Sequence, residues 1–73
     1  MDRNEKSLRR FGQLLAVMRE DRNLSVSELA SRSGLDSRQL KRIEAGDVNI
    51  HFTTILALAR GLGITPEELL KSL

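Results

Sequence analysis

The sequence predicts an all-α fold of five helices packed around one core. Its apolar residues recur with a helical period, and no strand-like alternation competes with that pattern. Polar N-cap residues mark helix starts, each followed three positions later by Glu or Gln; these pairs are Ser25–Glu28, Asp36–Gln39 and Thr65–Glu68. A chain of 73 residues suits one small domain, which we expect to span residues 1–73.

The first expected helix runs from Lys6 to about Arg22. Its apolar residues form a single stripe, which consists of Leu8, Phe11, Leu15 and Met18. Arg19 lies one turn beyond Leu15, at the edge of that stripe. The segment is therefore expected to be amphipathic, with one buried face.

Residues 25–45 are expected to form two short helices joined by a tight turn. Ser25 caps the first helix and Asp36 caps the second, while Gly34 supplies the backbone freedom that a sharp turn needs. Leu40 and Ile43 are the inward pair of the second helix. Two helices joined by a Gly-containing turn form the helix-turn-helix arrangement, which places its second helix in the major groove of DNA.

Two further helices are expected after this motif. One covers residues 52–60, and its nearly continuous apolar character indicates a central core helix that Gly61 and Gly63 interrupt. The other begins after Thr65, an N-cap residue, with Pro66 at its first position.

The outer face of the second helix of the motif carries positive charge. Leu40 and Ile43 fix its inward direction at about 100° per residue. The outward positions are then held by Arg38, Lys41 and Arg42. An ordinary solvated face also carries such cations, but the adjoining caps and turn favour a surface that binds double-stranded DNA. No cofactor is expected for that role.

Composition argues against several other classes of function. Twelve basic and ten acidic residues give a net charge of +2, so the positive charge is local rather than general. With no Cys and one His, the chain lacks the groups for a nucleophilic triad or a metal site, and we expect no enzyme activity. The charged N-terminus does not resemble a signal peptide and no apolar run would span a bilayer, so we expect a cytoplasmic protein without membrane contact.

The motif has a specific combination of residues at fixed spacings, which consists of Ala30, Gly34, Leu40, Glu44 and Gly46. Over about residues 8–70 the sequence resembles the Cro/Xre helix-turn-helix family of phage-type repressors and small bacterial regulators. The resemblance implies the compact five-helix DNA-binding fold of the lambda-repressor type. It also implies a sequence-specific transcriptional regulator, expected to be a repressor that acts on its own gene as well. Such a protein would bind a palindromic operator as a dimer.

The resemblance also implies the DNA-contacting residues. Base-contacting positions fall on Ser37, Arg38, Gln39, Lys41 and Arg42. Contacts with the DNA backbone fall on Ser25, Val26, Asn49 and His51. The family pairs an Arg of the first helix with a Glu near the end of the recognition helix, which here are Arg19 and Glu44.

Two features depart from the family pattern. Val26 stands where Gln commonly contacts a phosphate, so only backbone N–H groups remain there for an anion. His51 stands where Ser or Thr usually caps the fourth helix, and Ile50 where Pro is usual. This weakens the expected cap and leaves His51 either facing a phosphate or simply exposed.

The last helix predicts a homodimer interface. Its leucines spread over too wide an arc to pack on one core surface, so some of this set is expected to be exposed: Ile64, Leu69, Leu70 and Leu73. A second copy would bury that area symmetrically, and the alternative is that these leucines complete the core. A different alternative function is an antitoxin of the same fold, which would bind a toxin protein and also repress its own operon.

Overall fold

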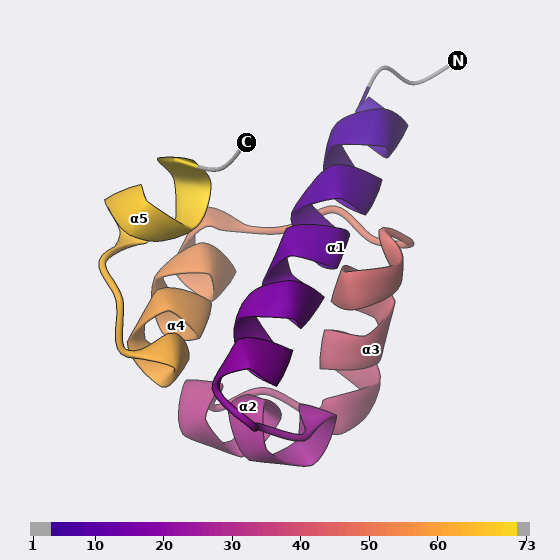
Figure 1. Cartoon of the computed structure of the whole chain (residues 1–73). Helices are drawn as coiled ribbons and strands as arrows, with labels where there is room; N and C mark the ends of the chain where they lie inside the picture. The colour runs from indigo at the N-terminus through magenta and orange to yellow at the C-terminus, as the bar shows by residue number, and fades with distance from the viewer. Residues whose placement is uncertain (1–3, 72–73) are drawn as a thin grey trace.

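The computed structural model describes residues 4–71, which form five α-helices and no strand. They are α1 (Asn4–Asp21), α2 (Val26–Ser33), α3 (Ser37–Ala45), α4 (Phe52–Leu62) and α5 (Pro66–Lys71). In the view of Figure 1, the long α1 runs between α3 on one side and α4 and α5 on the other. α2 lies across the end of α1. The predicted all-α fold of five helices is confirmed.

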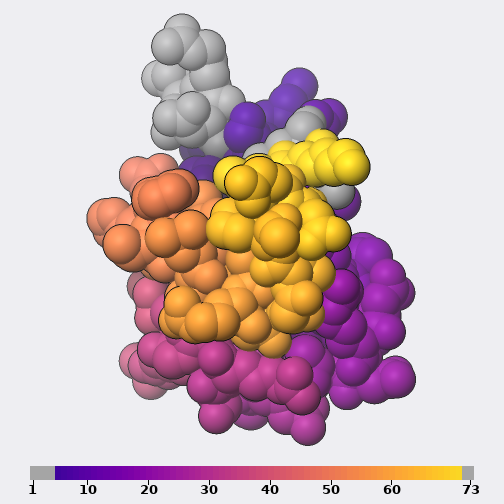
Figure 2. Space-filling model, turned by 90° about the vertical axis from the view of Figure 1, so that its left-hand side faces the viewer, coloured from indigo at the N-terminus to yellow at the C-terminus, as the bar shows by residue number. Residues whose placement is uncertain are grey.

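One hydrophobic cluster fills the space between the helices. It contains Phe11, Leu15, Leu24, Leu29, Ala30, Leu40, Ile43, Leu58, Ala59, Leu62 and Leu69. α1 packs mainly against α3, whereas α2 packs mainly against α4. Figure 2 shows α4 and α5 covering one face of the molecule, above α2. Each fully buried leucine contributes about 1.5–3 kcal/mol, so this cluster holds α3 in place from its inner side.

The helix starts and ends of the motif follow the predicted caps. At the start of α2, the Ser25 hydroxyl accepts from the backbone N–H of Glu28, whose carboxylate accepts from the N–H of Ser25. At the start of α3, Asp36 accepts from the N–H of Arg38 at 3.0 Å. Gly34 ends α2 with a φ of 70°, a left-handed conformation that costs glycine little.

The structure corrects the predicted end of α4. We expected the helix to stop at Arg60, but it continues through Gly61 to Leu62. Gly61 is buried against α2, where a Cβ atom would overlap the hydroxyl of Ser33. The glycine therefore serves close helix packing, and the left-handed Gly63 is the residue that ends the helix.

Smaller differences concern α1 and the start of α4. α1 begins at Asn4 and ends at Asp21, within two residues of the expected bounds. Asn23 follows with a φ of 56°, a conformation that Asn tolerates better than most residues. His51 occupies the N-cap position of α4 without a side-chain cap hydrogen bond. The weak cap expected from the sequence is thus confirmed.

Two reciprocal capping boxes make the stability of the fold depend on pH. The hydrogen bond from the Ser25 backbone lowers the pKa of Glu28, and the hydrogen bond from the Thr65 backbone lowers the pKa of Glu68. Because the pKa of each Glu is lower in the folded state than in the unfolded state, its ionised carboxylate stabilises the fold at pH values above the unfolded-state pKa. That stability is lost as the pH falls through the folded-state value.

We therefore expect the thermal unfolding midpoint to fall as the pH is lowered from about 5 to about 3. The double variant Glu28→Gln with Glu68→Gln should show a smaller fall, because Gln keeps the acceptor oxygen but does not titrate in this range. Glu67→Gln, on the same helix as Glu68, is the control. The same acid dependence in the double variant and in the wild type would contradict this account.

Candidate nucleic-acid interface

The helix-turn-helix presents α3 with one face inside and one face outside. Leu40 and Ile43 are 0% and 4% exposed, as the sequence predicted for the inward pair. The candidate base-contacting residues Arg38, Gln39, Lys41 and Arg42 are all exposed, and Ser37 is half-buried. The structure thus brings these five residues together along one helix. Within residues 4–71, Arg38, Lys41 and Arg42 form no ion pair, so their charges are available to an anionic ligand.

The start of α2 lies beside the start of α3. The Oγ atoms of Ser27 and Ser37 are 3.3 Å apart. Val26 packs its half-buried side chain partly against the core, and because that side chain is apolar, only its backbone N–H can donate to an anion. Ser25 is exposed, and its hydroxyl oxygen already accepts the capping hydrogen bond. Backbone N–H groups at a helix start suit a phosphate.

A groove of about 340 Å³ runs between α3 and the loop that leads to α4. Its polar lining includes Arg38 and Arg42 from α3 and Asn49 and His51 from the loop. Apolar residues, among them Val48, also line it. Gln39 of α3 lines it too, so the structure places three candidate base-contacting residues next to two candidate backbone-contacting residues. The groove joins the two sets into one surface.

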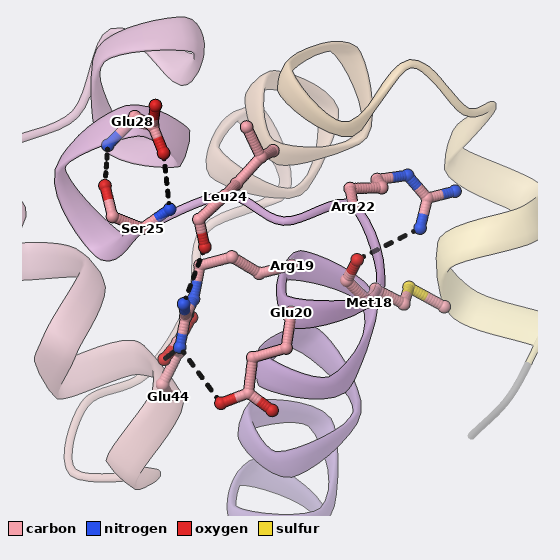
Figure 3. Close-up of polar contacts among 8 residues, drawn as sticks. All are labelled: Met18, Arg19, Glu20, Arg22, Leu24, Ser25, Glu28 and Glu44. Atoms are coloured by element: carbon pink, nitrogen blue, oxygen red, sulfur yellow. Dashed lines mark hydrogen bonds and ion pairs between the residues drawn. The ribbon is translucent and has the colours of Figure 1, made fainter.

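The end of α3 is held to α1 by an ion pair. The Arg19 guanidinium donates to Glu44 through Nε at 2.7 Å and Nη2 at 3.1 Å, and both side chains are 12% exposed (Figure 3). Arg19 also donates to the carbonyl oxygen of Leu24 at 2.9 Å. The hydrogen bond with Glu44 raises the pKa of Arg19. A nearly buried bidentate pair fixes orientation more than it adds net stability.

Two further contacts escaped the sequence reasoning. A Cβ atom at Gly12 would overlap the carbonyl oxygens of Ile43 and Glu44, so α1 lies directly against the end of α3. Arg22 donates to the carbonyl oxygens of Met18 and Leu62, both at 3.1 Å, and so joins the end of α1 to the end of α4. A glycine inside an apolar helical stripe was the available signal for the first contact. Arg22 could not be recognised from the sequence in this role, because it donates to backbone carbonyls, which every residue carries.

The expected dimer surface is smaller than the sequence suggested. Leu69 is 1% exposed and belongs to the core, so its assignment to an exposed interface is corrected: α5 turns this residue inward. Leu70 is 36% exposed and Ile64 is half-buried, whereas Leu73 lies outside the described residues. Phe52, which sequence reasoning did not select, is 66% exposed at the start of α4.

Other classes of site find little support in the part of the chain that the structure describes. No group of three or more His, Cys, Asp or Glu side chains there could hold a metal ion. None of its helices is both long enough and apolar enough to cross a membrane.

Comparisons with known proteins agree with this geometry. A family model described as a helix-turn-helix domain matches residues 10–71. The HTH-type transcriptional repressor RghR of Bacillus subtilis (strain 168) is 39% identical over 61 residues, which cover 82% of this chain and 45% of RghR. The chain therefore spans less than half the length of that relative. The crystal structure of the restriction-modification controller protein C.AhdI from Aeromonas hydrophila matches with a TM-score of 0.85 and 41% identity. That match covers 88% of this chain and 97% of C.AhdI.

The position of α3 on α1 should depend on the charge of Glu44. We expect Glu44→Gln to lower the free energy of unfolding, because the nearly buried Arg19 guanidinium would then lie beside a neutral partner. The loss should approach the ~3–5 kcal/mol seen when one partner of a buried pair is removed. Glu20→Gln is the matched control, since Glu20 is 67% exposed and 3.7 Å from the same Arg19; its cost should stay within about 1 kcal/mol. Urea unfolding at neutral pH measures both, and equal losses in the two variants would refute the assignment.

Proposed function

The chain belongs to the helix-turn-helix family of DNA-binding transcription regulators of the Cro/Xre type, and we propose that it is a repressor that binds a palindromic operator as a homodimer. In this proposal α3 enters the major groove and reads base edges. The observation that carries it is the outer face of α3, where Arg38, Lys41 and Arg42 are exposed together and without ion pairs within residues 4–71.

The residues along α3 have the chemistry that base edges require. Arg and Lys can donate to O6 and N7 of guanine, and Gln can bond both N6 and N7 of adenine. Arg38 and Gln39 lie in the first turn, the part of a recognition helix that meets base edges. Ser37 precedes them, and its hydroxyl can donate or accept.

Contacts with the DNA backbone would come from both sides of α3. The N-terminus of α2 offers the backbone N–H of Val26, which suits a phosphate. The backbone N–H of Ser25 already donates to the Glu28 carboxylate, so Ser25 would contact the DNA backbone through its exposed hydroxyl. Asn49 and His51 line the far side of the groove beside α3 and would reach the sugar-phosphate backbone there. Such contacts position the protein without specifying sequence.

A homodimer would match a palindromic site. The apolar residues offered for contact are Leu70 and Ile64, and Phe52 adds a large exposed side chain. A twofold axis uses the same surface on both copies. It would set the two recognition helices about 34 Å apart, as half-sites one helical turn apart require. Since the proposed ligand is the operator of a bacterial gene, the protein would act in the cytoplasm.

The antitoxin alternative gains no support from the relatives, which are described as a repressor and a restriction-modification controller. The first description names control of transcription. Repression of its own gene stays part of the proposal, and the DNA upstream of that gene is the first duplex to assay.

The base-reading role of Arg38 can be tested by DNA binding. We expect Arg38→Ala to weaken binding to the preferred duplex by about 1–3 kcal/mol and to relax the preference at one base pair of each half-site. Fluorescence anisotropy with duplexes substituted one base pair at a time measures this. The control is Arg10→Ala, which removes an exposed arginine from α1. If Arg38→Ala weakened binding to every duplex equally, Arg38 would contact only phosphate.

The dimer can be tested by sedimentation equilibrium. We expect the wild type to dimerise at micromolar concentration and Leu70→Glu to shift it to monomer, because the change places a charge in an apolar interface. Val17→Glu is the matched control, since Val17 is 52% exposed on α1. A monomeric wild type would reject the homodimer. Dissociation by Val17→Glu rather than by Leu70→Glu would move the interface to α1.

A further inference from the structure

A hydroxyl pair joins the start of α2 to the start of α3. The Oγ atoms of Ser27 and Ser37 lie 3.3 Å apart, although the two residues are ten positions apart in the sequence. Ser27 is the second residue of α2 and Ser37 is the first residue of α3. Among residues 4–71, this is the side-chain hydrogen bond that connects the two helices of the motif.

Neither hydroxyl is needed to cap a helix. Ser25 caps α2 by accepting from the N–H of Glu28, and Asp36 caps α3 by accepting from the N–H of Arg38. Ser27 is exposed and Ser37 is half-buried. The pair therefore sits at the surface on which α3 would meet DNA, and its contact is additional to those that define the helices.

The hydrogen bond with Ser27 restricts where Ser37 can present its hydroxyl to a base. A serine hydroxyl has one hydrogen and two lone pairs, and it rotates to suit its partners. When Ser27 donates to Ser37, Ser37 keeps its own hydrogen to donate outward. When Ser37 donates to Ser27, Ser37 offers only lone pairs outward. In both arrangements the hydrogen bond favours the rotamer of Ser37 that faces α2, because its oxygen must stay close to that of Ser27.

We propose that Ser27 is a positioning residue: by holding the hydroxyl of Ser37, it sets which base is preferred at the DNA base pair that Ser37 contacts. The inference rests on the proposed function, since α3 must lie in the major groove with Ser37 at a base edge. A hydroxyl oxygen favoured at one position bonds best to the base whose polar edge group lies within hydrogen-bond distance of that position, and a different base leaves a polar group unpaired there. Without Ser27, the hydroxyl of Ser37 would turn to suit several bases, and the preference would relax.

The experiment compares four proteins on one set of duplexes. The preferred duplex is selected from random-sequence DNA with the wild type, and each base pair is then substituted in turn. Fluorescence anisotropy at fixed salt gives the affinity of the wild type, Ser27→Ala, Ser37→Ala and the double variant. We expect Ser27→Ala to reduce discrimination about two- to tenfold, the range of one net hydrogen bond, at the base pair that Ser37→Ala also affects. The double variant should lose no more than Ser37→Ala alone.

Two further variants separate positioning from a general effect on α2. Ser31→Ala removes an exposed hydroxyl one turn further along the same helix and should leave discrimination unchanged. Ser27→Thr keeps a hydroxyl at the position and should retain the wild-type preference. A change in helix stability alone would move neither the base preference nor its dependence on Ser37.

Other outcomes would overturn the inference. An equal loss on every duplex would make Ser27 a phosphate contact, and additive effects of the two alanines would show that Ser27 does not act through Ser37. Unchanged discrimination in Ser27→Ala would reject the role outright. These results leave the proposed function standing, whereas a wild type without sequence preference would overturn both.

Discussion

The close contact between α1 and the end of α3 is the constraint on which the candidate interface depends. Gly12 allows the backbones to meet, because any side chain there would overlap the carbonyl oxygens at the end of α3. Arg19 and Glu44 then fix the angle between the helices through two charge-assisted hydrogen bonds. Since Leu40 and Ile43 hold the inner face, α3 has little freedom to roll or tilt. A rigid support of this kind is what a recognition surface requires.

The same arrangement separates two groups of cations. Arg19 lies in the last turn of α1 and Arg22 follows that helix, and both donate to groups of the fold itself, namely Glu44 and backbone carbonyls. Arg38, Lys41 and Arg42 project outward from α3 and form no ion pair among residues 4–71. A net charge of only +2 therefore conceals a local positive surface. Local charge is what counts for phosphate binding, because screening limits electrostatic reach to about 10 Å at ordinary salt.

Most of the fold could be predicted from the sequence because it depends on local chemistry. The remaining features depend on packing between distant residues and could not be predicted. The capping boxes at Ser25 and Thr65 act within four residues, so the sequence alone located those helix starts. Gly61 failed as a helix end because its role depends on Ser33 in another helix. The prediction that Leu69 belongs to an exposed interface was wrong for a similar reason. Helical spacing alone does not show which of several neighbouring leucines faces the core. The contact between Ser27 and Ser37 required the angle between α2 and α3, which no local pattern contains.

The length of α3 gives a separate reason for two copies on one operator. A helix of nine residues rises about 13 Å, which corresponds to about four base pairs of DNA. Each base pair discriminates by about 1–3 kcal/mol, and a site so short recurs throughout a genome. Specificity sufficient for a repressor therefore requires either a second reading helix or contacts outside α3. A twofold pair would double the number of base pairs read, so the size of α3 supports the proposed homodimer independently of the exposed apolar side chains.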